Sequence, residues 1–252
     1  MKIQVVSDIH LEFFKNLDAL ELEKFKKADY LFLAGDVGIP LDNELWLPFI
    51  TWCSENYTTV FYVLGNHESY GHVYNETVEY VRKTLTAFQN VFLLEKGVEV
   101  DLEGYKVVGC TLWTDLDEFT AEFLNDTKMI LEKKSYPPVN TAFIRNLHTI
   151  DKLWLSSVLD KLKGEKVIVM THHLPTKSCV HPRFKNSKYE RGFVADVDDL
   201  VDKACMWIFG HTHCHMDFQE GSTRFYANPL GYKHEKFFSM YKSEAIEILF
   251  TP

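Results

Sequence analysis

The segment "YLFLAGDVG" (30–38) places a short apolar run directly before an aspartate, Asp36, that lies between two glycines. An apolar run of this length is typical of a β-strand that is buried on both faces. The glycines would let other chain segments approach Asp36 closely. Similar short runs, each ending in polar or glycine residues, recur at 3–6, 59–65, 106–110, 166–170 and 206–210.

Amphipathic helical patterns lie between several of these runs. Apolar residues spaced three and four apart predict helices over 42–56, 75–88 and 147–162. Alternation of strands and helices favours an α/β architecture with covered sheets. The acidic segment 115–146 interrupts the alternation and is interpreted as a cap-like insertion, and 176–195 is a second irregular stretch. With no internal repeat, we expect one domain over 1–252.

Composition restricts the classes of partner. The 252 residues are 46% hydrophobic, enough for one substantial core. A formal charge of −9 disfavours sequence-independent binding to nucleic acid and binding to anionic membranes. The 5 cysteines form no C-x-x-C pair, which is typical of reduced thiols. With neither a signal-type region nor a membrane-length apolar run, we expect a cytoplasmic protein. The sequence leaves the oligomeric state open.

Polar side chains follow five of the predicted strands. In open α/β sheets, ligands bind outside the carboxyl ends of the strands, so these side chains are expected to converge. Asp8 and His10 are two residues apart, and an extended chain would point both to one side. The side chains that could donate to a metal ion are Asp8, His10, Asp36, Asn66, His172, His211 and His213.

Each of these short patterns alone is common in turns and loops, but together they indicate a metal centre. Seven donors are too many for one tetrahedral ion and suffice for two ions that share a carboxylate. Asp36, short and flanked by glycines, is the natural bridge. Two ions about 3.5–4 Å apart form the arrangement that promotes phosphoryl displacement. Carboxylate, amide and imidazole donors suit Mn, Fe or Zn and do not choose among them.

These patterns resemble those of the calcineurin-like metallophosphoesterases. The family's pattern appears here as "DIH", "GDVG", "GNHE", "HHLP" and "GHTH", between residues 8 and 213. The resemblance implies a four-layer α/β/β/α sandwich of two mixed sheets flanked by helices, with a dinuclear site between the sheets. It also implies a hydrolase that cleaves phosphoester bonds with a hydroxide bridging two metal ions.

The resemblance assigns roles to individual residues. It implies that one ion takes Asp8, His10 and His213. The other ion would take Asn66, His172 and His211. Asp36 would bridge the ions and belong to the catalytic machinery. His67 would be the catalytic histidine outside the metal shells, stabilising the phosphate or protonating the leaving oxygen.

The roles of two residues in or next to these motifs are less determined. Glu68 is expected to support the ligands without being one. His215 is either a third inward group or an exposed strand residue, and we favour the second.

The expected substrate is a phosphomonoester or phosphodiester of a small molecule or nucleotide. The alternatives are a nuclease, a phosphoprotein phosphatase, or a catalytically silent scaffold of the same fold that binds protein partners. Acidic charge disfavours the nuclease, and complete motifs disfavour the scaffold. The side chains that could select the substrate are Tyr70, Trp113, Asp115, Arg183, Arg191 and Asn228.

Overall fold

Two β-sheets form the centre of the computed structural model, which describes residues 1–42, 44–235 and 240–248. The first sheet has the order β11-β1-β2-β3-β4 and contains Ile246–Glu247, Lys2–Val6, Tyr30–Ala34, Thr59–Val63 and Val91–Leu93. The second has the order β5-β6-β7-β8-β10-β9 and contains Val100–Leu102, Tyr105–Cys110, Val167–Thr171, Met206–Phe209, Thr223–Ala227 and Met216–Glu220. Both are mixed, because β11 pairs antiparallel with β1, β5 with β6, and β9 with β10.

Helices connect the strands and cover the outer faces of both sheets. The α-helices are α1 (Trp46–Asn56), α2 (Tyr74–Leu85), α3 (Glu118–Ala121), α4 (Asp126–Met129), α5 (Thr141–Lys161), α6 (Glu190–Phe193) and α7 (Asp198–Val201). The short 3-10 helices are η1 (Leu11–Phe13), η2 (Leu17–Leu20), η3 (Leu22–Lys24), η4 (His67–Ser69), η5 (Lys177–Cys179) and η6 (Lys233–Glu235).

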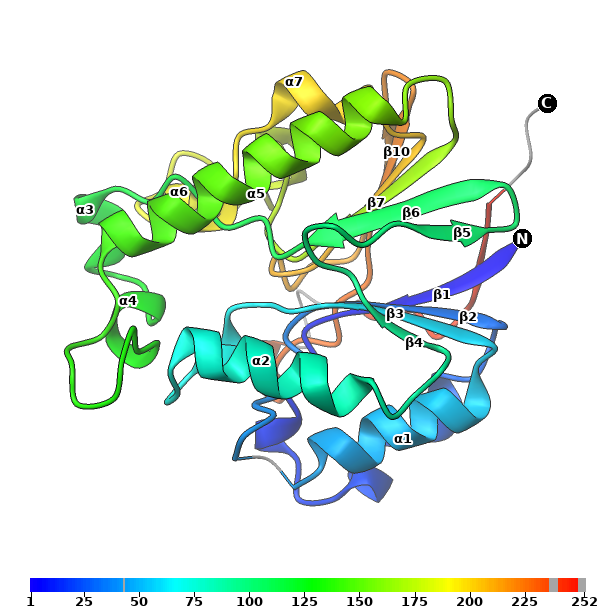
Figure 1. The fold of residues 1–252 in the computed structure, drawn as a ribbon, viewed down its shortest axis with the longest axis horizontal. Coiled ribbons are helices and arrows are strands. Elements are labelled where there is room, and N and C mark those ends of the chain that lie inside the picture. The colour runs from blue at the N-terminus through cyan, green and yellow to red at the C-terminus, as the bar shows by residue number, and fades with distance from the viewer. Residues whose placement is uncertain (43, 236–239, 249–252) are drawn as a thin grey trace.

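The elements stack in four layers (Figure 1). Helices α1 and α2 pack against the first sheet through a core that includes Phe49 and Val81. Helix α5 packs against the second sheet through Leu155 and neighbouring side chains. A third core lies between the sheets, where Phe32 is one of the buried residues. This is the α/β/β/α sandwich that the family resemblance implies, so the predicted fold class is confirmed.

The predicted strands match the observed ones to within one or two residues, whereas some helix limits differ. Helix α5 begins at Thr141, six residues before the predicted start at 147, because the Asn140 side chain accepts a hydrogen bond from the Phe143 amide and caps it. The segment 115–146 contains two four-residue helices, α3 and α4, as well as the start of α5.

Within the described residues, no helix combines the length and apolar character needed to span a membrane.

Phe32 tests the core between the sheets. It is fully buried and packs against Phe61, with ring centroids 4.7 Å apart. We expect Phe32→Ala to lower the free energy of unfolding by about 3–5 kcal/mol, since it removes buried area and leaves a cavity. Denaturant unfolding measures this change. Phe119→Ala, at a side chain 61% exposed, should change the free energy by less than about 0.5 kcal/mol. A loss below about 1 kcal/mol for Phe32→Ala would contradict this packing.

Candidate metal centre

The loops that follow five parallel strands meet at one end of the two sheets. Asp8 and His10 follow β1, Asp36 follows β2, and the His211–His213 loop follows β8. These candidate ligands share an unusual backbone: Asp8, His10, Asp36, His211 and His213 all have φ between 47° and 62°. Non-glycine residues rarely adopt left-handed conformations, and such strain concentrates at functional sites. The extended chain expected at Asp8 and His10 is therefore wrong, since tight turns aim both side chains.

The candidate ligands form two compact groups. Asp8, His10 and His213 form the first group. Asp36, His172 and His211 form the second. Within each group, one possible ligand atom from each residue lies within 4.8 Å of those of the others. His172, and not its neighbour His173, belongs to the second group. The structure therefore brings together the residues that the sequence pattern singles out, in two adjacent sets.

Asp36 belongs to the second group and also faces the first. One carboxylate oxygen, Oδ2, is 3.9 Å from His10 Nε2. The other, Oδ1, is 3.4 Å from His172 Nε2. Each oxygen of Asp36 therefore faces a histidine of a different group.

A glycine allows Asp36 to sit this close to the next loop. A Cβ at Gly65 would lie 2.1 Å from Asp36 Oδ1, nearer than any side chain can approach. Only glycine fits at this position of the "GNHE" sequence.

Three of the histidines are held from behind by oxygen acceptors. His172 Nδ1 lies 2.9 Å from the Ala34 carbonyl oxygen, which can only accept a hydrogen bond. His213 Nδ1 lies 2.5 Å from Glu235 Oε2. His10 Nδ1 lies 3.2 Å from Glu12 Oε1. These partners place the proton on Nδ1 and turn each Nε2 inward, which is the usual arrangement of metal-binding histidines.

The contact between His10 and His213 also fits a bound divalent cation. The inward Nε2 atoms of His10 and His213 face one another at 3.1 Å. Two lone pairs at that distance repel, so either a proton or a cation must lie between them. Asp8 Oδ1 is only 3.3 Å from the same His213 atom. Imidazole and carboxylate donors directed at one point suit Mn, Fe or Zn.

Asn66 contributes an oriented amide. Its Nδ2 donates to the Tyr70 hydroxyl at 2.9 Å and to Asp126 Oδ1 at 2.8 Å. The amide oxygen is thereby directed towards His172 Nε2, at 3.0 Å. Asn66 thus lies beside the second group with its oxygen facing it.

Glu68 is buried behind the loops and belongs to neither group. Its carboxylate accepts hydrogen bonds from the backbone amides of Gly65, Asp36 and Val37 at 2.7–3.1 Å, and from the Tyr62 hydroxyl at 2.7 Å. Burial, followed by the charge of Asp36, raises the pKa of Glu68 to about 7. Glu68 therefore ties the β2 and β3 loops together, as a supporting residue would.

His67 lies beside both groups, with its two ring nitrogens turned to different partners. Nδ1 is 3.0 Å from Glu12 Oε1, and Nε2 is 3.2 Å from the Tyr232 hydroxyl. Burial lowers the pKa of His67, but the charges of Asp36 and Glu12 outweigh burial, so the net shift is upward. Glu12 accepts at Nδ1, so Nε2 is the ring nitrogen on the cleft side, and it carries a proton when the ring is in its imidazolium form.

The charges of the centre are strongly coupled. Burial alone would lower the pKa of His213, yet Asp8 and Glu235 raise it to about 10. For Glu12, burial opposes the charged form, but hydrogen bonds with His10 and His67 lower its pKa to about 2. Without added cations, the buried carboxylates therefore hold positive charge on nearby histidines. Bound cations would replace those protons.

The centre opens into a cleft with a cavity volume of about 210 Å³. Both irregular segments form its walls. Residues 123–126 come from the segment 115–146, and Phe184 and Phe193 come from 176–195. The segments also contact one another, because Gly192 leaves room for the Leu124 side chain, which a Cβ would meet at 2.6 Å.

Of the six described residues that the sequence marked as candidates for substrate selection, one lines the cleft. Tyr70 lines the cleft and lies against His67, with centroids 4.1 Å apart. Asn228 is instead structural, since its buried amide donates to the carbonyls of Val5 and Lys242. Trp113 is buried in the core beneath the segment 115–146. Among described residues, the cleft lining includes none of Asp115, Arg183 and Arg191.

His215 lies outside both groups. It is half-buried, precedes β9 and packs edge-on against Tyr226, with centroids 5.5 Å apart, so the exposed strand residue that the sequence favoured is wrong.

Four residues that contact the candidate ligands or His67 were not predicted from the sequence. Glu12, Asp126, Tyr232 and Glu235 contact candidate ligands or His67, yet no strand-end pattern marks them. Glu12 stands two residues after His10, and that spacing was the one available signal.

Two facing mixed sheets with buried carboxylates and imidazoles at their strand ends define a class of metal-binding α/β sandwich. The family model of the calcineurin-like phosphoesterases matches residues 1–215, and the chain belongs to that family. The match covers every strand-end sequence described above.

Individual proteins are also similar to this chain in sequence or in structure. Uncharacterized protein L509 of Acanthamoeba polyphaga mimivirus is 27% identical to this chain over an alignment 261 residues long. The alignment covers 93% of this chain and 92% of that protein. Phosphopantetheinyl hydrolase (PptH) from Mycobacterium tuberculosis has a similar structure, with a TM-score of 0.75 at 16% identity, covering 100% of this chain and 96% of that one. The protein TT1561 of Thermus thermophilus has a TM-score of 0.57 at 17% identity, covering 90% and 88% of the two chains. At these identities the structures show a shared fold.

Glu12 offers a test of the arrangement around His10. We expect Glu12→Gln to weaken Mn²⁺ binding about 10–100-fold, because outer partners of metal-binding histidines contribute that much to affinity. Titration against a chelator of known affinity measures the change. Glu21→Gln, at an exposed carboxylate, is the matched control. Equal Mn²⁺ affinity in wild type and Glu12→Gln would show that Glu12 does not support a metal ligand.

Proposed function

We propose that this protein hydrolyses phosphoester bonds of a small molecule or nucleotide with two bound divalent cations. The observation that carries the proposal is Asp36, whose two oxygens face two separate ligand groups. In this proposal, Asp8, His10 and His213 hold one cation. Asn66, His172 and His211 hold the other, and Asp36 bridges them. Mn, Fe and Zn are the candidate metals.

When bound, the two cations would supply an activated water molecule and offset the negative charge of the phosphoester. The chain's own residues do the rest. Asp36 fixes the relative position of the two ligand groups. His67 directs Nε2 into the cleft, where it can donate a proton to the leaving oxygen. Glu12 holds His67 in the required orientation by accepting from Nδ1.

The cleft supports a small substrate. Its cavity volume of about 210 Å³ and its walls from two segments suit a phosphate with a modest organic group. We propose the segment 115–146 as a cap on this cleft within one domain, since Asp126 lies 2.8 Å from Asn66. A walled cleft and an acidic chain both disfavour a nuclease or a phosphoprotein phosphatase.

Reconstitution tests the proposal. The protein would be loaded separately with Mn²⁺, Zn²⁺ and Fe²⁺ and given a chromogenic phosphomonoester and the matching diester. Phosphopantetheine and a nucleoside monophosphate complete the panel. We expect metal-dependent hydrolysis of at least one ester. Asp36→Asn should lose this activity and bind one cation fewer than the wild type. Two bound cations without hydrolysis of any ester would favour the catalytically silent scaffold.

His67→Ala separates catalysis from metal binding. We expect kcat to fall about 10²–10⁴-fold, the usual contribution of a general acid, while the metal content stays at the wild-type value. Steady-state kinetics and elemental analysis on the same samples measure both quantities. His215→Ala serves as the control, because His215 lies outside both ligand groups. Joint loss of metal and turnover would make His67 a structural residue instead.

A further inference from the structure

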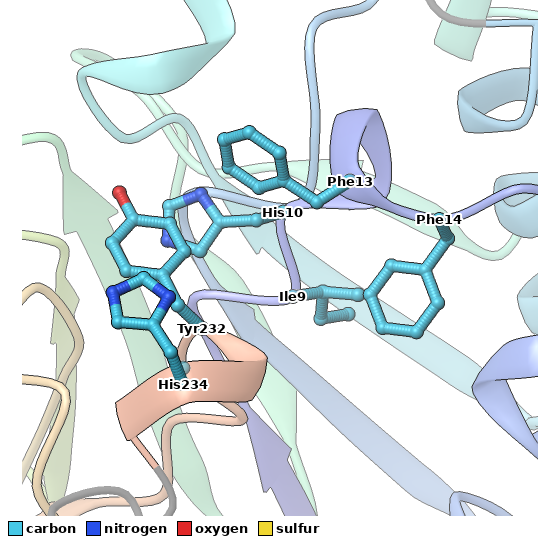
Figure 2. Close-up of a pocket in the computed structure, with 7 residues that line it drawn as sticks. Ile9, His10, Phe13, Phe14, Tyr232 and His234 are labelled. Carbon is cyan, nitrogen blue, oxygen red and sulfur yellow. The ribbon is translucent and has the colours of Figure 1, made fainter.

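A second cavity adjoins the metal centre. Its volume is about 380 Å³, and it lies between the loop after β1 and the loop that leads into η6. Figure 2 shows these two segments facing one another, with side chains directed into the space between them. The lining residues are Ile9, His10, Phe13, Phe14, Gly231, Tyr232 and His234.

Aromatic rings form the walls at the mouth of this cavity. Tyr232 and His234 are stacked, with an interplanar angle of 8° and centroids 5.5 Å apart. Phe13 stands nearly perpendicular to Tyr232, at 81° and 5.4 Å. Phe13 is also 60% exposed, although it is large and apolar. His10 and His234 already lie against Tyr232, so the exposed Phe13 ring is the surface of this set on which another flat ring can pack.

The cavity borders the proposed reaction site, and Tyr232 lines both. His10, a candidate ligand, forms part of its wall, and the Tyr232 ring lies against His10 with centroids 4.4 Å apart. Tyr232 also lines the cleft, where its hydroxyl is 3.2 Å from His67 Nε2. An organic group attached to a phosphate in the cleft would have to pass Tyr232 to enter the cavity.

The chemistry of the lining indicates what the cavity accepts. Among described residues, it contains no Asp, Glu, Lys or Arg side chain, whereas the cleft contains Asp36, Asp126 and Glu235. The polar groups of this lining are the imidazoles of His10 and His234 and the Tyr232 hydroxyl. An uncharged ring would bury apolar surface and gain contacts with Phe13 and Tyr232.

We propose that this cavity is a subsite for a flat, uncharged ring, such as a nucleobase or an aryl group, in the organic part of the phosphoester substrate. The subsite rests on the proposed phosphoesterase activity, since it assigns a place to the part of the substrate that is not phosphate. Phe13 and Tyr232 are its specificity-determining residues.

The test compares two esters that differ only in a ring. The substrates are 3-phenylpropyl phosphate and n-propyl phosphate, or their methyl diesters if the protein cleaves diesters. Their leaving alcohols have closely similar acidity, so a difference in kcat/KM reports binding of the ring. We expect wild-type protein to prefer the phenyl ester about tenfold, which corresponds to about 1.4 kcal/mol and is typical of one ring stacked on aromatic side chains.

Variants at Phe13 assign the preference to this cavity. Phe13→Ala should lower the kcat/KM ratio to about threefold or less, and Phe13→Tyr should keep the wild-type ratio because it retains the ring. Tyr136→Ala is the control, since Tyr136 is 62% exposed and does not line either cavity. A wild-type ratio near one, or a ratio unchanged in Phe13→Ala, overturns the subsite while leaving the phosphoesterase proposal intact.

A binding measurement covers the case in which neither ester is hydrolysed. Saturation-transfer NMR with 3-phenylpropylphosphonate, which resists hydrolysis, reports contact between the protein and the phenyl protons. Transfer in the wild type that is lost in Phe13→Ala supports the subsite even if the phosphoesterase proposal fails. Absence of transfer in the wild type overturns the subsite.

Discussion

The burial of Asp8 and Asp36 is the constraint on which the rest of this structure depends. Both carboxylates are almost completely shielded from solvent, and a buried charge costs several kcal/mol unless it is paired. Histidines that follow strands of the second sheet pair with these carboxylates and offset that cost. His213 lies against Asp8, and His172 lies against Asp36. Because each carboxylate and its histidine follow strands of different sheets, these pairs connect the loops of the two sheets. Cations that replace the histidine protons would strengthen the same connection.

The strands and the candidate ligands could be predicted from the sequence. The backbone conformation that orients the ligands could not. Short apolar runs predicted the strands because buried parallel strands need continuous apolar side chains. The left-handed backbone at Asp8 and His10 was missed, since residues of any type can be forced into it by surrounding contacts. Tyr232 lies 165 residues along the chain from His67, so no local pattern marks that contact. The early start of α5 was readable in principle from Asn140, a favoured capping residue.

The two cavities beside the ligand groups have linings of opposite character, and in the proposed function each would bind a different part of the substrate. The cleft is lined by Asp36, Asn66 and His67, which suit cations and a phosphate. The neighbouring cavity is lined mainly by aromatic and aliphatic side chains. Tyr232 borders both, with its hydroxyl towards His67 and its ring towards Phe13. In the proposed function, Tyr232 would link the position of the organic group to that of His67.

The central claim is that two cations share Asp36, and electron paramagnetic resonance of the Mn²⁺-loaded protein tests it most directly. Two Mn²⁺ ions joined by one carboxylate are magnetically coupled, so the account predicts the multi-line spectrum of an exchange-coupled pair at two ions per chain. In Asp36→Asn that spectrum should collapse to the six-line signal of isolated Mn²⁺. A wild-type spectrum of isolated, uncoupled ions at full loading would contradict the shared carboxylate.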